Sequence, residues 1–155
     1  IGNDNAPGQF VISGHNSIVD KVVANHKSLG IKRAIKLPVS APFHCRLMEK
    51  ARENMESYIQ DLELLSPKLI LVNNVGAAPL TETNKIKDSL VEQITNTVRW
   101  RESIDNMCDL GVDNFIEIGA GNVLSGLVKR INKTVNSISI QNIENIENYI
   151  NILEG

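Results

Sequence analysis

Segments with the period of a β-strand alternate with segments that have the period of an α-helix along this chain of 155 residues. Strand-like apolar runs occupy residues 9–13, 32–37, 69–72, 115–118 and 137–140. Amphipathic helical patterns occupy residues 16–29, 47–62, 86–96, 99–110, 123–131 and 143–153. Such alternation is typical of α/β proteins, so we predict an α/β fold with a mostly parallel sheet. The continuous apolar run at 69–72 predicts a strand buried on both faces.

Charge and hydropathy exclude two large classes of partner. The chain has 16 Lys and Arg against 18 Asp and Glu, with a net charge of -2 and no basic cluster. We therefore expect no nucleic acid as a partner, because phosphate binding needs a concentrated basic face. No apolar run approaches the ~20 residues that cross a bilayer, so we expect no membrane segment. The first residues resemble neither an initiator methionine nor a signal peptide, and the chain reads as one entered midway.

The two cysteines, Cys45 and Cys108, form neither a disulfide framework nor a metal-ligand spacing. Unpaired cysteines are usual in reducing compartments. We therefore expect a cytoplasmic protein without a metal site.

His44 is the first candidate for chemistry. It lies in a loop-like stretch that follows an expected strand and precedes a strong amphipathic helix. Catalytic groups of α/β proteins often occupy such loops beyond the ends of strands. From position alone, a histidine that merely packs in its loop is the alternative. The neighbouring Cys45 is either a thiol nucleophile paired with His44 or a small, partly buried thiol.

No activated serine accompanies this histidine. A nucleophile elbow has the pattern Gly-x-Ser-x-Gly, with the serine on a strained strand-to-helix turn. The segment Gly14-His15-Asn16-Ser17 has its serine one place too late and lacks the closing glycine. A histidine base activates a hydroxyl only if that hydroxyl is positioned beside it, so the chain alone is expected to lack a nucleophile.

The turn Gly119-Ala120-Gly121 links an expected strand to an expected helix. It resembles part of a dinucleotide fingerprint, but the third glycine of that pattern would fall at Leu124. The other interpretation is a tight turn that lets the helix pack closely on its strand.

Four segments carry motifs that are recognisable as a set. They are Asn3-Asp4-Asn5-Ala6-Pro7-Gly8-Gln9, Leu37-Pro38-Val39-Ser40-Ala41-Pro42-Phe43-His44-Cys45, Val72-Asn73-Asn74-Val75 and Glu117-Ile118-Gly119-Ala120-Gly121-Asn122-Val123-Leu124-Ser125-Gly126-Leu127. In this order they resemble the motifs of malonyl-CoA:acyl carrier protein transacylases. The resemblance covers essentially the whole chain and corresponds to the C-terminal part of that family.

The resemblance implies the C-terminal part of an α/β-hydrolase-like core, together with the end of an inserted ferredoxin-like subdomain. Residues 1–37 would be the end of the small ferredoxin-like subdomain. Residues 38–155 would be the C-terminal part of the acyltransferase core. The family's serine lies in a Gly-His-Ser-x-Gly elbow and is followed by an arginine that grips the malonyl carboxylate. Neither feature occurs among these 155 residues.

The resemblance also implies a reaction: transfer of malonyl from malonyl-CoA to the phosphopantetheine thiol of acyl carrier protein in fatty-acid biosynthesis. The malonyl group would pass through a serine ester, with His44 as general base and acid and with no cofactor. A backbone carbonyl at Gln93 would hold the imidazole; otherwise Gln93 is a solvated helix residue. Phe43, beside the histidine, would favour malonyl over a branched acyl group, and Asn5 would line the entrance.

Two other functions stay open from the sequence. One is the acyltransferase domain of a polyketide synthase, which uses the same chemistry. The other is a non-catalytic fragment that binds acyl carrier protein, and the absence of the serine would favour it.

Overall fold

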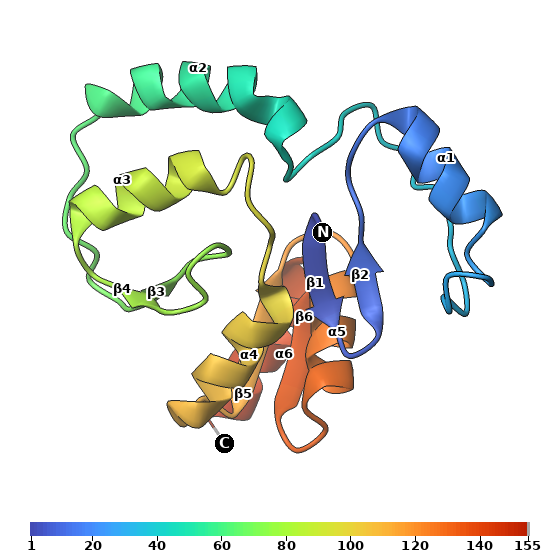
Figure 1. The fold of residues 1–155 in the computed structure, drawn as a ribbon. Helices are drawn as coiled ribbons and strands as arrows, with labels where there is room; N and C mark the ends of the chain where they lie inside the picture. Colours follow the sequence, from blue (N-terminus) through green and yellow to red (C-terminus); the bar gives the residue numbers. More distant parts are fainter. Residues whose placement is uncertain (155) are drawn as a thin grey trace.

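The computed structural model describes residues 1–154 and is an α/β fold with small sheets (Figure 1). The strands are β1 (Asn3–Ala6), β2 (Gln9–Val11), β3 (Leu71–Val72), β4 (Pro79–Leu80), β5 (Asn114–Ile118) and β6 (Asn136–Ile140). The helices are α1 (Asn16–Ala24), the short 3-10 helix η1 (Arg46–Met48), α2 (Glu49–Gln60), α3 (Thr83–Glu92), α4 (Trp100–Asp109), α5 (Val123–Ile131) and α6 (Ile143–Glu154).

β5, α5 and β6 form the most regular part of the fold. The two strands pair in parallel, from Asn114 opposite Asn136 to Ile118 opposite Ile140. Parallel neighbours need a crossover connection, and α5 supplies it by packing on both strands. The strands predicted at 115–118 and 137–140 and the helix between them are thereby confirmed.

The N-terminal hairpin is joined to the segment that leads into α4. β1 and β2 pair antiparallel around Pro7 and Gly8, and Gly8 has a φ of +73°, the conformation that the third residue of a Pro-Gly turn requires. On its other side β1 meets Val98, because Asp4 N donates to Val98 O and Val98 N donates to Gly2 O, both at 2.8 Å. β1 also packs against α4 and α5, so the hairpin lies beside the regular part of the fold.

Three expectations about strands are wrong within the described residues. Only Leu71–Val72 of the run at 69–72 is a strand, it pairs antiparallel with β4, and Leu69 and Ile70 are 82% and 70% exposed. Residues 32–37 form no strand. The sheet is not mostly parallel, since two of the three strand pairs are antiparallel. A strand forms only where a partner accepts its hydrogen bonds, and an apolar run by itself specifies no partner.

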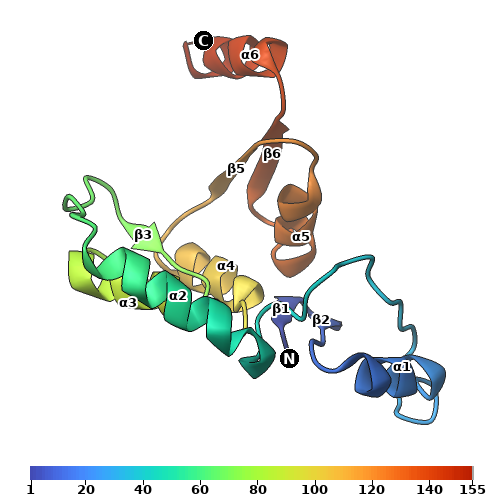
Figure 2. The same cartoon turned by 90° about the horizontal axis from the view of Figure 1, so that it is seen from above.

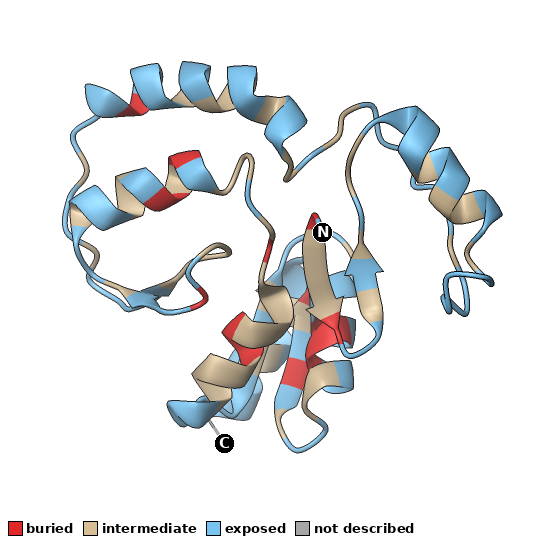
Figure 3. Ribbon diagram, viewed as in Figure 1, coloured by how far each residue is buried: buried red, intermediate tan, exposed pale blue. Residues whose placement is uncertain are grey.

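Burial is sparse and is concentrated around β1, α4, α5 and β6 (Figure 3). The buried apolar side chains are Ala6, Ile59, Ala77, Val91, Val98, Ile104, Leu127, Val128 and Ile140. The accessible surface is 10977 Å², whereas a compact monomer of this mass would expose about 7,800 Å². These 155 residues therefore leave much of their apolar surface uncovered.

The elements spread apart around this small centre (Figure 2). α1 has no buried residue and stands away from the other helices. α2 and α3 pack on each other and bury Ile59 and Val91. Among the described residues, no helix is both long and apolar enough to cross a membrane.

Candidate functional site

His44 lies in the loop between α1 and η1, and its backbone is held in an uncommon conformation. Its φ is +61°, in the left-handed region that few non-glycine residues adopt. Such conformations persist where surrounding structure enforces them, and they cluster at functional sites. His44 is half-buried as a residue, so part of its surface stays exposed.

The structure brings His44 and Gln93 together. His44 Nδ1 lies 2.7 Å from the backbone carbonyl oxygen of Gln93. A carbonyl oxygen can only accept, so Nδ1 must carry the proton and donate it. In the neutral ring Nε2 is then the unprotonated nitrogen, which is the form of a general base.

The contact is made by the carbonyl at the C-terminal end of α3. Gln93 is the residue that follows the last helical position, Glu92. Carbonyls at this end of a helix lack intrahelical partners and carry partial negative charge. When the imidazole takes up a proton, its positive charge therefore faces the partial negative charge of the helix end.

The other predicted site residues are not hydrogen-bonded to the imidazole. Phe43 is 47% exposed beside the histidine. The side chain of Asn5 is half-buried and makes no hydrogen bond within residues 1–154. Cys45 Sγ donates to Pro42 O at 3.1 Å, so its thiol is directed at its own loop, which supports a packing role.

The turn between β3 and β4 belongs to this neighbourhood, and the sequence reasoning gave it no role. Asn74 Nδ2 donates to Gln93 Oε1 at 3.4 Å, and Arg99 Nη1 donates to Val75 O at 2.9 Å. The sequence did contain a signal for a role of Asn74, because this residue belongs to the Val-Asn-Asn-Val motif. Nothing in the linear sequence places that motif beside Gln93.

The Gly119-Ala120-Gly121 turn is built around Glu117. The Glu117 carboxylate accepts hydrogen bonds from Ser125 N at 2.8 Å, Ser125 Oγ at 2.8 Å and Leu124 N at 3.1 Å. These contacts, the Ser125 backbone N–H first, lower the pKa of Glu117 below its ordinary value. The two N–H groups belong to the first turn of α5, where they have no helical acceptor. Gly119 and Gly121 have φ values of +145° and +91°, so the glycines serve the turn. A Cβ at either position would meet no atom within 4 Å, so close packing of the helix on its strand does not require them.

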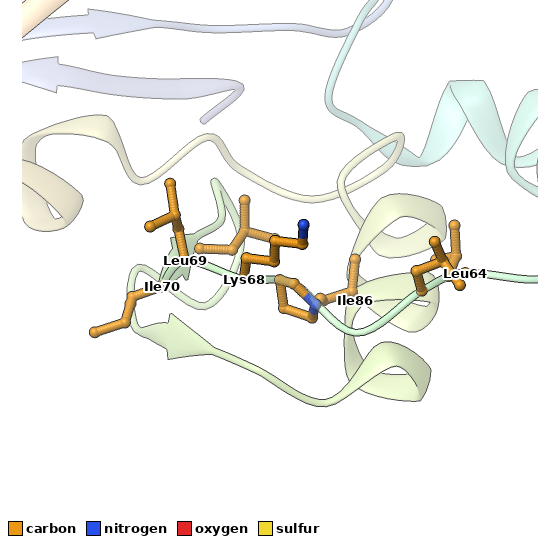
Figure 4. Close-up of a pocket in the computed structure, with 8 residues that line it drawn as sticks. Leu64, Lys68, Leu69, Ile70 and Ile86 are labelled. Carbon is orange, nitrogen blue, oxygen red and sulfur yellow. The ribbon is translucent and has the colours of Figure 1, made fainter.

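One hollow in the surface does not include the histidine. It has a volume of about 440 Å³ and is lined by Leu64, Leu65, Pro67, Lys68, Leu69, Ile70, Leu71 and Ile86 (Figure 4). It contains neither His44 nor Gln93, and its lining is almost wholly apolar. It lacks the convergent polar groups of a catalytic site. Residues 1–154 contain no group of three or more His, Cys, Asp or Glu side chains that could hold a metal ion.

No family model matches the chain. Curated proteins do: a malonyl CoA-acyl carrier protein transacylase of Staphylococcus aureus is 46% identical over 142 residues, covering 92% of this chain and 46% of that relative. An acyl-carrier-protein-S-malonyltransferase structure from Bartonella henselae is 40% identical, with a TM-score of 0.92 over 100% of this chain and 49% of the other.

A second solved structure contains a malonyl-transacylase in complex with a type II polyketide synthase acyl carrier protein. Its identity is 34% and its TM-score 0.93, over 97% of this chain and 49% of that chain. The chain thus spans about half the length of the relatives that it matches. By sequence and by fold, this chain is a homologue of malonyl CoA-acyl carrier protein transacylases and corresponds to about half of their length.

Proposed function

We propose that this chain contributes the acid–base part of the active site of an enzyme that transfers malonyl from malonyl-CoA to acyl carrier protein. The observation that carries the proposal is the 2.7 Å hydrogen bond from His44 Nδ1 to Gln93 O, which leaves Nε2 as the free base. The similarity to transacylases that include this region supports the same assignment.

The reaction would proceed in two exchanges, with a serine supplied by sequence outside these 155 residues. In the first, His44 Nε2 removes the serine proton, the serine oxygen attacks the thioester carbonyl, and the departing CoA thiolate takes the proton from the imidazolium. In the second, Nε2 removes the proton of the phosphopantetheine thiol. The thiolate attacks the serine ester, and the serine oxygen leaves with that proton. The residues proposed here require no metal or cofactor.

Phe43 and Asn5 would act on the substrate. Phe43 immediately precedes the base in the sequence and is 47% exposed, and its bulky ring would collide with an α-methyl branch of the substrate. Excluding one methyl group is worth only about 1–3 kcal/mol, so the ring would favour malonyl without strict selection. Asn5 would line the entrance to the site. Acyl carrier protein and the CoA thioester would be the partners, in the cytoplasm.

The finer architecture is part of the proposal. Residues 1–37 would be the end of a ferredoxin-like subdomain, and residues 38–155 would be the C-terminal part of an α/β-hydrolase-like core. The isolated position of α1 is compatible with such a division. β1 would then lie at the junction, since it packs against α4 and α5.

A chimera tests the function directly. In it this chain replaces the matching 142 residues of the Staphylococcus aureus relative, so that a serine elbow and the base stand in one protein. Transfer of radiolabelled malonyl from malonyl-CoA to acyl carrier protein is then measured for the chimera and for its His44→Ala variant. We expect transfer that depends on His44. A folded chimera without transfer, or equal transfer by both proteins, would refute the proposal.

A further inference from the structure

The Gln93 carbonyl, which accepts the hydrogen bond of the imidazole, has a different kind of donor from the carbonyl before it at the end of α3. The preceding carbonyl, Glu92 O, accepts hydrogen bonds from Thr95 N at 3.2 Å and from Asn96 N at 3.1 Å. Among the described residues, Gln93 O accepts a hydrogen bond from His44 alone. The direction of this carbonyl therefore sets the orientation of the imidazole, and whatever fixes Gln93 also fixes the base.

Besides His44, one side chain from outside α3 is hydrogen-bonded to Gln93, and it meets the glutamine side chain. The Asn74 carboxamide donates from Nδ2 to Gln93 Oε1 at 3.4 Å, and both residues are half-buried. Asn74 lies in the connection between β3 and β4, which curls back beside the C-terminal end of α3 (Figure 1).

That connection is braced from two directions. Asn73 Oδ1 accepts hydrogen bonds from Val75 N at 3.1 Å and Gly76 N at 2.6 Å, which closes the turn locally. Arg99 N donates to Asn74 O at 2.8 Å, and Arg99 Nη1 donates to Val75 O at 2.9 Å. Asn74 thus projects from a rigid turn and can restrain a neighbour.

We propose that Asn74 is a positioning residue for the base: its carboxamide restrains Gln93, whose carbonyl keeps the proton of His44 on Nδ1. The inference rests on the proposed function of His44. Asn74 touches neither the imidazole nor, in this assignment, the substrate. Removing the Asn74 carboxamide should therefore lower kcat and reduce the Nδ1–H tautomer of His44, while the KM for malonyl-CoA stays unchanged.

The competing explanation is that Asn74 only stabilises the turn, and a matched variant separates the two roles. Asn106 is also half-buried, and its Nδ2 donates to Ala77 O at 2.6 Å, at the other end of the same turn and away from Gln93. Asn74→Leu removes a carboxamide that projects from this turn, and Asn106→Leu removes a carboxamide of the same size that donates to it. Only the first removes a contact with Gln93.

The experiment uses the chimera described above, with ¹⁵N-labelled histidine and with His44 assigned through a His44→Gln variant. The ¹⁵N shifts of the two ring nitrogens report which one carries the proton. We expect Asn74→Leu to reduce the Nδ1–H form and to lower kcat about three- to tenfold, the equivalent of one neutral hydrogen bond. Asn106→Leu should lower the melting temperature and leave both readouts unchanged.

A double-mutant cycle with Gln93→Leu completes the test, because residues that act through one another are not additive. The Asn74→Leu/Gln93→Leu protein should lose no more activity than the more impaired single variant. Additive losses, an unchanged tautomer in Asn74→Leu, or an equal shift in Asn106→Leu would overturn the inference. An inactive chimera whose tautomer still responds to Asn74→Leu alone would instead refute the proposed function and retain the positioning contact.

Discussion

His44 Nδ1 and the backbone carbonyl of Gln93 are joined across 2.7 Å although the residues are 49 positions apart in the chain. The contact joins a loop whose backbone is in the left-handed region to the C-terminal end of a helix. The acceptor is a main-chain atom of Gln93, so the side chain at position 93 can be replaced while the acceptor of the hydrogen bond stays in place.

Replacing His44 should therefore cost far more than replacing Gln93. In the chimera, His44→Ala removes the proton carrier and should lower transfer about 10²–10⁴-fold. Gln93→Ala keeps the carbonyl and should cost less. Transfer of labelled malonyl to acyl carrier protein provides the rates, and circular dichroism checks that both variants fold. Equal losses would mean that the glutamine side chain acts on the imidazole directly.

The 155-residue chain by itself should transfer no malonyl, because it contains no Gly-x-Ser-x-Gly elbow. Incubation with radiolabelled malonyl-CoA, followed by acid precipitation, should leave no label on the protein. The chimera is the positive control. A stable malonyl ester on any serine of the isolated chain would contradict this prediction.

The uncovered apolar surface should make the isolated chain associate. Leu69 and Ile118 are 82% and 81% exposed, and apolar patches of this kind promote association. Size-exclusion chromatography should show species larger than the 17.1 kDa monomer. Leu69→Ser with Ile118→Ser should shift the protein toward the monomer, whereas Glu147→Gln on the exposed face of α6 should not. A clean monomer with sharp cooperative unfolding would count against this expectation.

The stability of the α5 turn should depend on pH through Glu117. Its pKa is lowered in the folded state by the Ser125 and Leu124 donors. The carboxylate therefore contributes its full stabilisation above the unfolded value of 4.5, and that contribution is lost as the pH falls through the folded pKa.

Glu117→Gln should consequently lower the melting temperature of the chimera at pH 7. The difference from the unsubstituted chimera should narrow as the pH falls below 4.5. Glu147→Gln, whose side chain is exposed on α6, is the control. A difference that stays constant with pH would show that the Glu117 charge does not support the turn.

Elements with a strong local pattern were predictable. The run at 115–118, the two glycines after it and the apolar periodicity of α5 lie next to one another in the sequence, and the structure forms them as one unit. Local patterns suffice where strand, turn and helix make most of their contacts with each other.

Elements that depend on distant partners were not predictable. Residues 69–72 have the composition of a buried strand, yet only Leu71–Val72 pairs, because no other segment within residues 1–154 covers Leu69 and Ile70. The Pro-Gly turn was visible in the sequence, but the pairing of β1 with Val98 was not. Hydrogen bonds between distant segments carry no local signature.

The sequence by itself determined the α/β class, the order of the motifs and the presence of a histidine in a loop suited to chemistry. Tertiary structure decided which atom of Gln93 meets the imidazole, which ring nitrogen carries the proton and that Asn74 reaches the same glutamine. The physical reason is that residue types and spacing express local conformational preference, whereas a hydrogen bond between positions 44 and 93 exists only once a loop and a helix end have been packed together.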